Sequence, residues 1–590
     1  MDAGHLAVMF AGSVARHGER PATRVRVGGE FTVQTYAELG EQVRRLAARL
    51  IERGLEPGDR VAIFSTNRPE WSLADLACAA ATLVSVPLYP TSTPDQVRHI
   101  IGDSGAKLVF AAGQAELDKL AAAGLGALPM VTFDELDDVV TLSAELAAAP
   151  SDQSAVDARL EQASADDLAT IIYTSGTTGE PKGVMLTHRG FTHQVAVLNR
   201  YFTITPEDSS LCFLPLSHAL ERAWTYVVLA DGCLNTYVPD PRTVAEMLVA
   251  AKPTLLASVP RLFEKVFNTA NEKVAGSPLK QKVLAWALRT GSAYHDVLRA
   301  GKHPDPMLTL KLKIADKLAL GAIRDAMGGP KVVLACGGAP LRTEIEDFFY
   351  GCGLLVLQGY GLTEASPLVT FPYSAGIRFG TVGKVMDGGE LRVADDGQIQ
   401  YRGPNLMLGY WGKPEETAAT IVDGWLQTGD VGVLDEDGFL KITDRIKNLI
   451  VTSTGKNVAP APIEGLLASD PLFEYTLVLG DNRPYLTLLI APSLPHLEDI
   501  AHQLQVTWSK REELLNNQQV LDEIWRRIHA LTDKLPKHEQ VKALRLLIEG
   551  FTQENGLLTP SLKVKRREVE QRFSSLVEDM YNRAGKLLKR

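Results

Sequence analysis

The chain has 590 residues, of which 45% are hydrophobic and 22% charged, and its formal net charge is −10. This length exceeds one ordinary hydrophobic core, so we expect a globular protein of two or more domains. The acidic balance argues against a general nucleic-acid-binding protein, which is usually basic.

The cysteines and the first residues bear on the cellular compartment. The five cysteines lack a CxxC pair, which disfavours a disulfide framework or a zinc site and fits buried, reduced thiols. No basic segment followed by an apolar core opens the chain, so we expect no secretory signal and a cytoplasmic location. The longest apolar stretch, residues 73–89, contains Asp75 and is too short for a membrane span, so it predicts a buried helix that leads into a strand.

The first 150 residues alternate helical and strand patterns. Apolar spacing predicts helices over residues 35–51 and 71–81, and short apolar runs predict strands at 61–64 and 84–88. Such alternation is typical of parallel sheets covered by helices. The middle of the chain continues the pattern, with strands expected at 255–259, 332–335 and 354–357, and a helical region expected over 262–327.

The pattern changes near residue 380. Asp396-Gly397 separates two short alternating segments, which indicates a β-hairpin in a small β-rich subdomain. After a boundary near Asp444, strands are expected at 476–479 and 486–491, and charged helices over 497–549. We therefore expect an α/β fold: an N-terminal domain, residues 1–443, with two α/β subdomains and a small β-rich subdomain, and a smaller, mobile α+β C-terminal domain, residues 444–590.

One segment carries most of the functional information. The apolar run at 168–173 predicts a buried strand, and it is followed by Thr174-Ser175-Gly176-Thr177-Thr178-Gly179-Glu180-Pro181-Lys182. Glycines let the backbone approach an anion, amide and hydroxyl groups donate to it, and Lys182 adds positive charge. The spacing differs from the P-loop of GTPases. The segment predicts a triphosphate-binding loop; the alternative is a polar surface turn.

This segment resembles the phosphate loop of the adenylate-forming superfamily, which includes acyl- and aryl-CoA synthetases, luciferases and peptide-synthetase adenylation domains. Further segments resemble the same family in the same order. The resemblance implies that Gly337, Gly338, Ala339 and Pro340 line an adenine pocket. In the segment Gln358-Gly359-Tyr360-Gly361-Leu362-Thr363-Glu364, it implies stacking of Tyr360 on the purine, a phosphate contact of Thr363, and a carboxylate of Glu364 for Mg²⁺. Gln358 and Gly359 count among the ATP-binding residues.

The resemblance extends into the second half of the chain. It implies that Asp430 binds the ribose, that Arg445 contacts ribose and phosphate, and that Lys447 is a hinge between the domains. The loop Gly455-Lys456-Asn457 is implied to bind CoA. Lys563 is implied to be the mobile catalytic lysine; Leu562 replaces the usual glycine there, so Lys565 stays open as the alternative.

Two segments indicate the substrate. Residues 214–222, with His218, and residues 259–265 resemble the long-chain acyl-CoA synthetases. His218 is then implied to lie between the acyl pocket and the adenylate; the alternative is a core histidine. The implied activity converts a long-chain fatty acid and Mg-ATP to acyl-AMP and pyrophosphate, and then forms a thioester with CoA.

Three alternatives to this activity stay open. A fatty acyl-AMP ligase would pass the acyl group to a carrier protein, a non-catalytic sensor would only bind ATP or acyl chains, and a luciferase would share the motifs. The basic end of the chain, with Lys586, Lys589 and Arg590, fits a solvated helix end or peripheral contact with anionic lipid at the inner face of the membrane. The sequence indicates neither the oligomeric state nor the preferred acyl chain length.

Overall fold

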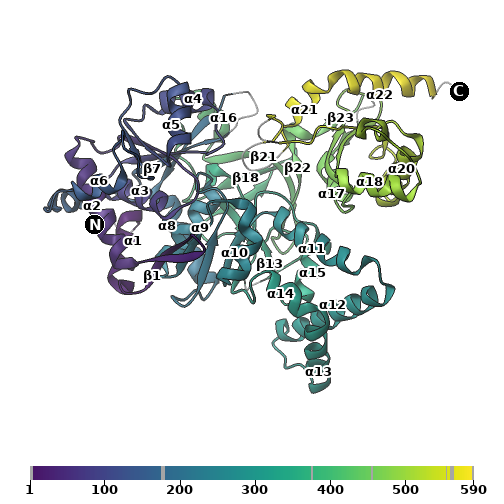
Figure 1. Ribbon diagram of the computed structural model, residues 1–590, viewed down its shortest axis with the longest axis horizontal. Helices are drawn as coiled ribbons and strands as arrows, with labels where there is room; N and C mark the ends of the chain where they lie inside the picture. The colour runs from purple at the N-terminus through teal and green to yellow at the C-terminus, as the bar shows by residue number, and fades with distance from the viewer. Residues whose placement is uncertain are drawn as a thin grey trace. The chain divides into compact units, whose positions relative to one another are not determined.

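The computed structural model describes residues 4–174, 180–373, 376–453, 456–552, 555–558 and 564–587. The chain forms a large N-terminal unit and a smaller C-terminal unit (Figure 1). The large unit comprises Met1–Arg392, Gln400–Thr428 and Leu434–Leu440; the small unit comprises Val393–Ile399, Gly429–Val433 and Lys441–Arg590. The predicted fold class, a large N-terminal α/β part followed by a smaller mixed part, is confirmed.

The first large sheet of the N-terminal unit has seven strands. Its central strands run parallel, and β7, β8 and β19 pair antiparallel at one edge. In spatial order the strands are β19 (Gly409–Tyr410), β8 (Lys182–Thr187), β7 (Leu168–Thr174), β4 (Val84–Leu88), β3 (Arg60–Phe64), β5 (Leu108–Ala111) and β6 (Met130–Thr132). Strands β3 and β4 are mostly apolar and almost entirely buried because both of their faces are covered.

The second large sheet also has seven strands, parallel except for the β1–β2 hairpin. In spatial order they are β13 (Val356–Gln358), β12 (Val333–Cys336), β11 (Leu255–Ser258), β9 (Ser209–Cys212), β10 (Leu234–Tyr237), β1 (Pro21–Val27) and β2 (Glu30–Thr35). The strands predicted in this region are confirmed, with ends shifted by one or two residues.

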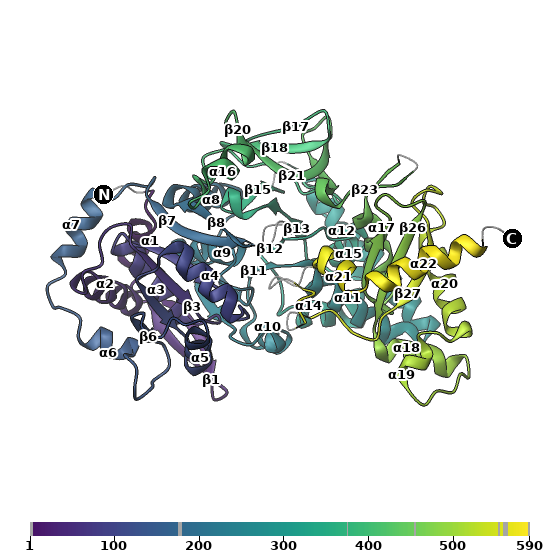
Figure 2. The same ribbon diagram turned by 90° about the horizontal axis from the view of Figure 1, so that it is seen from above.

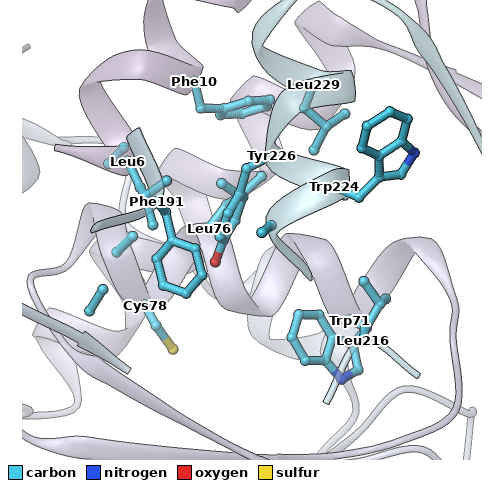
Figure 3. Packing of buried hydrophobic residues seen from close by; sticks show 14 of the residues in the cluster. Leu6, Phe10, Trp71, Leu76, Cys78, Phe191, Leu216, Trp224, Tyr226 and Leu229 are labelled. Atoms are coloured by element: carbon cyan, nitrogen blue, oxygen red, sulfur yellow. The ribbon is translucent and has the colours of Figure 1, made fainter. Parts of the chain in front are cut away.

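One hydrophobic core contains residues of both sheets and of the helices between them, and Figure 3 shows part of its packing. Its helices are α1 (Leu6–His17), α2 (Tyr36–Glu52), α3 (Pro69–Ala80), α8 (His188–Tyr201) and α9 (Ala219–Ala230). Trp71 and Leu76 of α3 gather here with Phe191 of α8 and Tyr226 of α9. The predicted helix at 35–51 is confirmed as α2, which begins with a capping box between Thr35 and Glu38.

Other helices cover the outer faces of the two sheets. The first sheet carries α4 (Pro94–Ser104) and α5 (Gln114–Ala122), with α6 (Leu142–Ala147) and α7 (Ser154–Gln162) nearer α2. The second carries a separate core with α10 (Val244–Ala251), α11 (Pro260–Ala275), α12 (Pro278–Arg299), α13 (Pro306–Ala315), the π-helical turn η2 (Asp316–Leu320), α14 (Gly321–Ala326) and α15 (Thr343–Gly351). The helical region predicted over 262–327 is therefore confirmed.

The β-rich part follows the second large sheet. A three-stranded sheet contains β14 (Tyr360–Gly361), β15 (Leu368–Phe371) and β16 (Lys384–Val385), and the turn η3 (Thr363–Ala365) lies within it along the chain. A five-stranded sheet contains β17 (Glu390–Val393), β18 (Gln398–Arg402), β20 (Ile421–Val422), β21 (Trp425–Leu434) and β22 (Leu440–Arg445), and α16 (Pro414–Thr420) precedes β20. The hairpin predicted at Asp396-Gly397 joins β17 to β18, and Gly397 adopts a φ of +83°.

The C-terminal unit packs helices on a three-stranded sheet of β25 (Phe473–Leu479), β26 (Leu486–Pro492) and β27 (Val541–Leu546) (Figure 2). One core holds α17 (Pro460–Leu467), α18 (Leu494–Gln503), α19 (Arg511–Leu514) and α20 (Gln518–Thr532), and another holds α21 (Arg566–Arg572) and α22 (Ser574–Leu587). The short elements η4 (Ile446–Asn448), β23 (Ile450–Val451) and β24 (Asn457–Val458) come first.

One secondary-structure prediction is wrong in this unit. Helices were expected through residue 549, but residues 541–546 form β27, which pairs parallel to β26. Val541, Leu544 and Leu546 are buried, and the charged Lys542 and Arg545 between them give the segment the composition of a helix surface. The long-range pairing with β26 decides the outcome.

The helices of the described residues bear on whether the chain crosses a membrane. None of the helices in that part of the chain combines the length and the apolar character needed to cross a bilayer. The apolar stretch at 73–89 is the end of α3 and β4, as predicted.

Candidate functional site

The predicted phosphate loop connects two antiparallel strands. Thr174 ends β7, Lys182 begins β8, and the two residues lie opposite each other in the ladder. The connection therefore starts at the carboxyl end of a buried strand, where ligands commonly bind in α/β sheets. Five predicted ATP-binding residues of this loop lie outside the described residues: Ser175, Gly176, Thr177, Thr178 and Gly179.

Lys182 has an acidic neighbour on a different element. Its Nζ forms an ion pair with Glu416 of α16, and Glu416 also lies 3.8 Å from Lys413 Nζ. The hydrogen bond from Lys182 holds the pKa of Glu416 below its usual value. Since Lys182 is the predicted cation for the phosphates, a bound polyanion would compete with Glu416 for it.

Tyr410 connects Lys182 to Glu364. Lys182 Nζ lies 5.4 Å from the centroid of the Tyr410 ring, and Tyr410 Oη donates a 2.9 Å hydrogen bond to Glu364 Oε1. Burial, together with the Glu364 carboxylate, raises the pKa of the Tyr410 phenol far above its usual value, so the phenol stays protonated and donates. Two predicted site residues, distant in the sequence, are thereby brought together by a residue that sequence analysis missed.

The carboxylate of Glu364 suits a hard cation. No group of three His, Cys, Asp or Glu side chains within the described ranges is arranged to hold a metal ion. Magnesium keeps several water ligands and binds through one or two carboxylates together with substrate phosphates. Glu364 therefore fits a magnesium ion that arrives with a nucleotide. The adjacent Thr363 is buried at the start of η3.

The predicted adenine-binding segments lie side by side. Cys336 at the end of β12 pairs with Gln358 at the end of β13, and Gly359 N donates to Cys336 O at 2.8 Å. Gly338 has a φ of +83°, which favours glycine, and a Cβ on Gly359 would meet Phe371 at 2.7 Å. Gly338, Ala339 and Pro340 are exposed beyond this edge, and Gly337 and Tyr360 are half-buried.

Gln358, one of the predicted ATP-binding residues, holds the segment that follows β12. Its side chain is 5% exposed, and both ends of the amide are used by one residue of the adenine loop. Gln358 Oε1 accepts from Leu341 N at 2.8 Å, and its Nε2 donates to Leu341 O at 3.2 Å. We therefore assign Gln358 to positioning the loop after β12.

His218 lies at the N-terminus of α9. Its Nδ1 accepts from Leu220 N at 3.2 Å, so the neutral ring carries its proton on Nε2. A Cβ built on Gly337 would lie 3.6 Å from Leu220 Cδ2, which places the start of α9 beside the predicted adenine-binding loop. His218 is half-buried, so it is neither a fully buried core histidine nor an open surface residue.

Two buried polar residues missed by sequence analysis hold the segment before His218. Asn67 donates to Leu214 O at 2.7 Å and accepts from Leu216 N at 3.0 Å, and Glu221 Oε2 accepts from Leu214 N at 3.1 Å. Burial raises the pKa of Glu221 to about 8. The signal that could have identified Asn67 is its position among polar residues that follow strand β3.

In the C-terminal unit, Asp430 and Arg445 form an ion pair. Arg445 Nε donates to Asp430 Oδ1 at 2.7 Å; Asp430 is buried and Arg445 is exposed. The neighbouring Asp444 is buried and accepts from the backbone N–H groups of Arg445 and Ala461. Strands β21 and β22 thus bring the two predicted ribose-binding residues together, and an exposed guanidinium is left beside a buried carboxylate.

The remaining predicted residues are only partly described. Lys447 is exposed in η4. Thr452 and Lys456 are joined by backbone and hydroxyl hydrogen bonds, and Asn457 begins β24. Gly455 and Lys563 lie outside the described residues.

The alternative lysine, Lys565, is better described. It is the N-cap residue of α21, and its backbone N donates to Leu557 O. The next residue, Arg566, forms a two-bonded ion pair with Glu464 at 2.7 and 3.0 Å. These contacts fix the segment immediately after Lys563 on the C-terminal unit.

The family assignment follows from comparison with known proteins. A family model described as AMP-binding enzyme matches residues 10–411, and a model of the C-terminal domain of AMP-binding enzymes matches residues 447–585. The chain belongs to the AMP-binding enzyme family. The predicted membership of the adenylate-forming superfamily is thereby confirmed.

Relatives of this AMP-binding enzyme match it over nearly the whole length of the given chain. It is 36% identical to the long-chain-fatty-acid–CoA ligase FadD15 of Mycobacterium bovis, with 94% of each chain covered. It is 30% identical to long-chain-fatty-acid–CoA ligase 5 of Rattus norvegicus, with 93% of this chain and 84% of the relative covered. The crystal structure of ATP-bound MatB from Rhodopseudomonas palustris matches with a TM-score of 0.70 at 25% identity, covering 97% of this chain and 99% of that one.

Proposed function

We propose that this AMP-binding enzyme is an AMP-forming long-chain fatty-acid–CoA ligase. The observation that carries the proposal is the assembly of Lys182, Tyr410 and Glu364 at the end of β7, which suits the phosphates and the magnesium ion of Mg-ATP. The names of the relatives support the acyl substrate and CoA.

The first half-reaction activates the fatty acid, because a free carboxylate has no good leaving group and an acyl-adenylate has AMP. The fatty carboxylate attacks the α-phosphorus of ATP, the bond to the β-phosphate oxygen breaks, and acyl-AMP and pyrophosphate result. Thr174 and Lys182, with the three other hydroxyl residues of the loop, Ser175, Thr177 and Thr178, would hold the β- and γ-phosphates, and Lys563 would bridge the carboxylate and the α-phosphate. Glu364 would hold magnesium, which neutralises phosphate charge. Catalysis is then mainly positioning and electrostatic stabilisation.

The second half-reaction needs room for CoA. We propose that the C-terminal domain, residues 444–590, rotates about Lys447, withdraws Lys563 and brings the loop Gly455-Lys456-Asn457 to the acyl-adenylate. The CoA thiol then attacks the acyl carbonyl, the thiol proton is lost, and AMP leaves. One lysine and the pantetheine arm cannot occupy the same space, so a conformational step between the half-reactions is physically reasonable.

A series of fatty acids of increasing chain length tests this proposal. Pyrophosphate and AMP release would be measured with Mg-ATP for each acid, with and without CoA. We expect turnover that depends on CoA and peaks at long chains. Pyrophosphate release without a response to CoA would instead favour the fatty acyl-AMP ligase, and ATP binding without any turnover would favour the sensor.

We also propose a cytoplasmic location, supported by five cysteines that are all free and buried.

Glu364→Gln is expected to reduce acyl-AMP formation by about 10²–10³-fold, because it removes the magnesium-binding charge but keeps an oxygen that can accept from Tyr410. Pyrophosphate release across a magnesium titration measures the effect. Tyr410→Phe is the matched control: it removes the hydrogen bond but leaves the carboxylate, so we expect a much smaller loss. A rate for Glu364→Gln close to that of the parent at every magnesium concentration would refute the assigned role.

Glu416→Gln is expected to tighten ATP binding by about three- to tenfold, because Lys182 then loses the carboxylate that competes with the phosphates. The dissociation constant for ATP, measured by calorimetry, reports the change. Glu415→Gln is the control, since Glu415 lies in the same helix, is exposed and carries the same charge. Unchanged or weaker ATP binding by Glu416→Gln would show that the ion pair positions Lys182 and does not compete for it.

A further inference from the structure

Helix α13 and the turn η2 have two apolar faces. The inner face packs against the N-terminal unit: Ala315 and Leu320 are buried, and Leu312 and Ala319 contact the same core. The outer face carries large apolar side chains that remain exposed. They are Met307 (60% exposed), Leu310 (53%), Ile314 (46%) and Leu318 (59%).

The exposed residues form one stripe. They recur at intervals of three, four and four residues, which places them on a common side of a helix. Figure 1 shows α13 at the outer end of the α12–α13 hairpin, away from the strands of the N-terminal unit. A helix at the surface of a globular protein normally turns one apolar face inward and a polar face outward. Packing within the N-terminal unit therefore explains the inner face and leaves the outer stripe uncovered.

Positive charge surrounds the stripe. Residues 299–318 contain five Lys or Arg residues and two Asp residues, although the whole chain has a net charge of −10. Lys302, Lys311, Lys313 and Lys317 are exposed, and none of them has an acidic partner within the described ranges. Lys311 precedes Ile314 by three residues and Lys317 follows it by three, so helical geometry puts them on opposite sides of the stripe.

The two aspartates are already engaged. Asp305 caps α13 by accepting from Leu308 N at 2.8 Å, and Asp316 pairs with Arg324 at 2.9 Å. Residues 299–318 keep a net positive charge, which Arg299 and the four exposed lysines carry. An apolar stripe bordered by lysines is the pattern of a helix that lies in the interface of an anionic membrane.

We propose that α13 and η2 dock this stripe, Met307, Leu310, Ile314 and Leu318, on an anionic lipid surface. The apolar side chains enter the boundary between headgroups and acyl chains, and the lysines contact the headgroups. A second copy of the chain is a poorer occupant, because pairing two such stripes would set lysine rims of like charge against each other. The proposal does not depend on the enzymatic activity, since lipid binding is measured without substrate.

Co-sedimentation of the full chain with vesicles tests the proposal. Vesicles of phosphatidylcholine with phosphatidylglycerol are compared with vesicles of phosphatidylcholine alone, at low and high salt. We expect binding to the anionic vesicles that weakens as salt rises. The variant Met307→Gln/Leu310→Gln/Ile314→Gln/Leu318→Gln should lose at least about tenfold in partitioning. Lys311→Glu/Lys317→Glu should lose the preference for anionic vesicles.

Matched variants separate this surface from general effects. Val27→Gln/Val33→Gln removes exposed apolar residues from the β1–β2 hairpin, and Lys534→Glu/Lys537→Glu makes the same charge change in the C-terminal unit. Both should bind vesicles like the parent, and all variants should keep the parent melting temperature. Absence of vesicle binding by the parent, or equal binding by the parent and both α13 variants, would overturn the proposal. A dimer that the α13 variants dissociate, without vesicle binding, would identify a second copy as the occupant.

Discussion

Replacing Lys563 with alanine is expected to slow acyl-AMP formation by about 10²–10³-fold, because the developing charge between carboxylate and α-phosphate loses its cation. Thioester formation from supplied acyl-AMP and CoA should stay close to the parent rate, since the proposed domain rotation withdraws this lysine. Pyrophosphate release reports the first half-reaction, and CoA consumption with synthetic acyl-AMP reports the second.

Lys565→Ala is the control for this experiment and also decides between the two lysines. Lys565 is the N-cap residue of α21, and its position relies on its backbone hydrogen bond to Leu557 O, which alanine retains. We expect adenylation by Lys565→Ala within a few-fold of the parent. If instead Lys565→Ala loses adenylation and Lys563→Ala keeps it, the catalytic assignment moves to Lys565. Equal loss of both half-reactions in Lys563→Ala would contradict the proposed domain rotation.

Asp75→Ala is expected to destabilise the N-terminal unit by about 3–5 kcal/mol, because it leaves the fully buried Arg222 without its counter-charge. Arg222 and Asp75 form an ion pair, and Tyr226 donates to Asp75 at 2.5 Å. Arg222 also donates to Ser85 of β4 and to Thr170 of β7, so this cluster fastens α9 to the strand that leads into the phosphate loop. The free energy of unfolding from denaturant titration measures the loss.

Arg402→Ala serves as the control for the buried pair. Arg402 pairs with Glu390 at 2.7 Å, but both side chains are about half exposed, so we expect little change in stability. A loss by Asp75→Ala as small as that of Arg402→Ala would mean that the cluster is hydrated in solution.

Local sequence patterns determined most of the fold. Continuous apolar runs identified buried strands, and apolar spacing over residues 35–51 identified α2. These signals depend on residues close together in the chain, so they can be recognised without the tertiary structure. The order of the motifs also identified the family. Each motif is a short contiguous segment, so it can be recognised in the sequence without knowing its position in the fold.

Long-range contacts were decided only by the tertiary structure. Strand β27 carries charges typical of a helix surface and is a strand because β26 offers a pairing edge. Tyr410 became part of the site because β19 pairs with β8 and thereby brings its hydroxyl to Glu364. Gln358 of β13 holds the segment after β12 through two hydrogen bonds to Leu341, a pairing that the sequence did not indicate.

The sequence by itself determined several of the central strands, much of the helical structure, the order of the motifs and the family. The tertiary structure decided which side chains of those motifs meet each other and which face of an apolar helix is covered. Residues 307–320 are rich in apolar side chains on two sides, and only packing reveals that Ala315 and Leu320 are inside and Leu310 and Leu318 outside. The physical reason is that periodicity is a property of one helix, whereas burial depends on what packs against it.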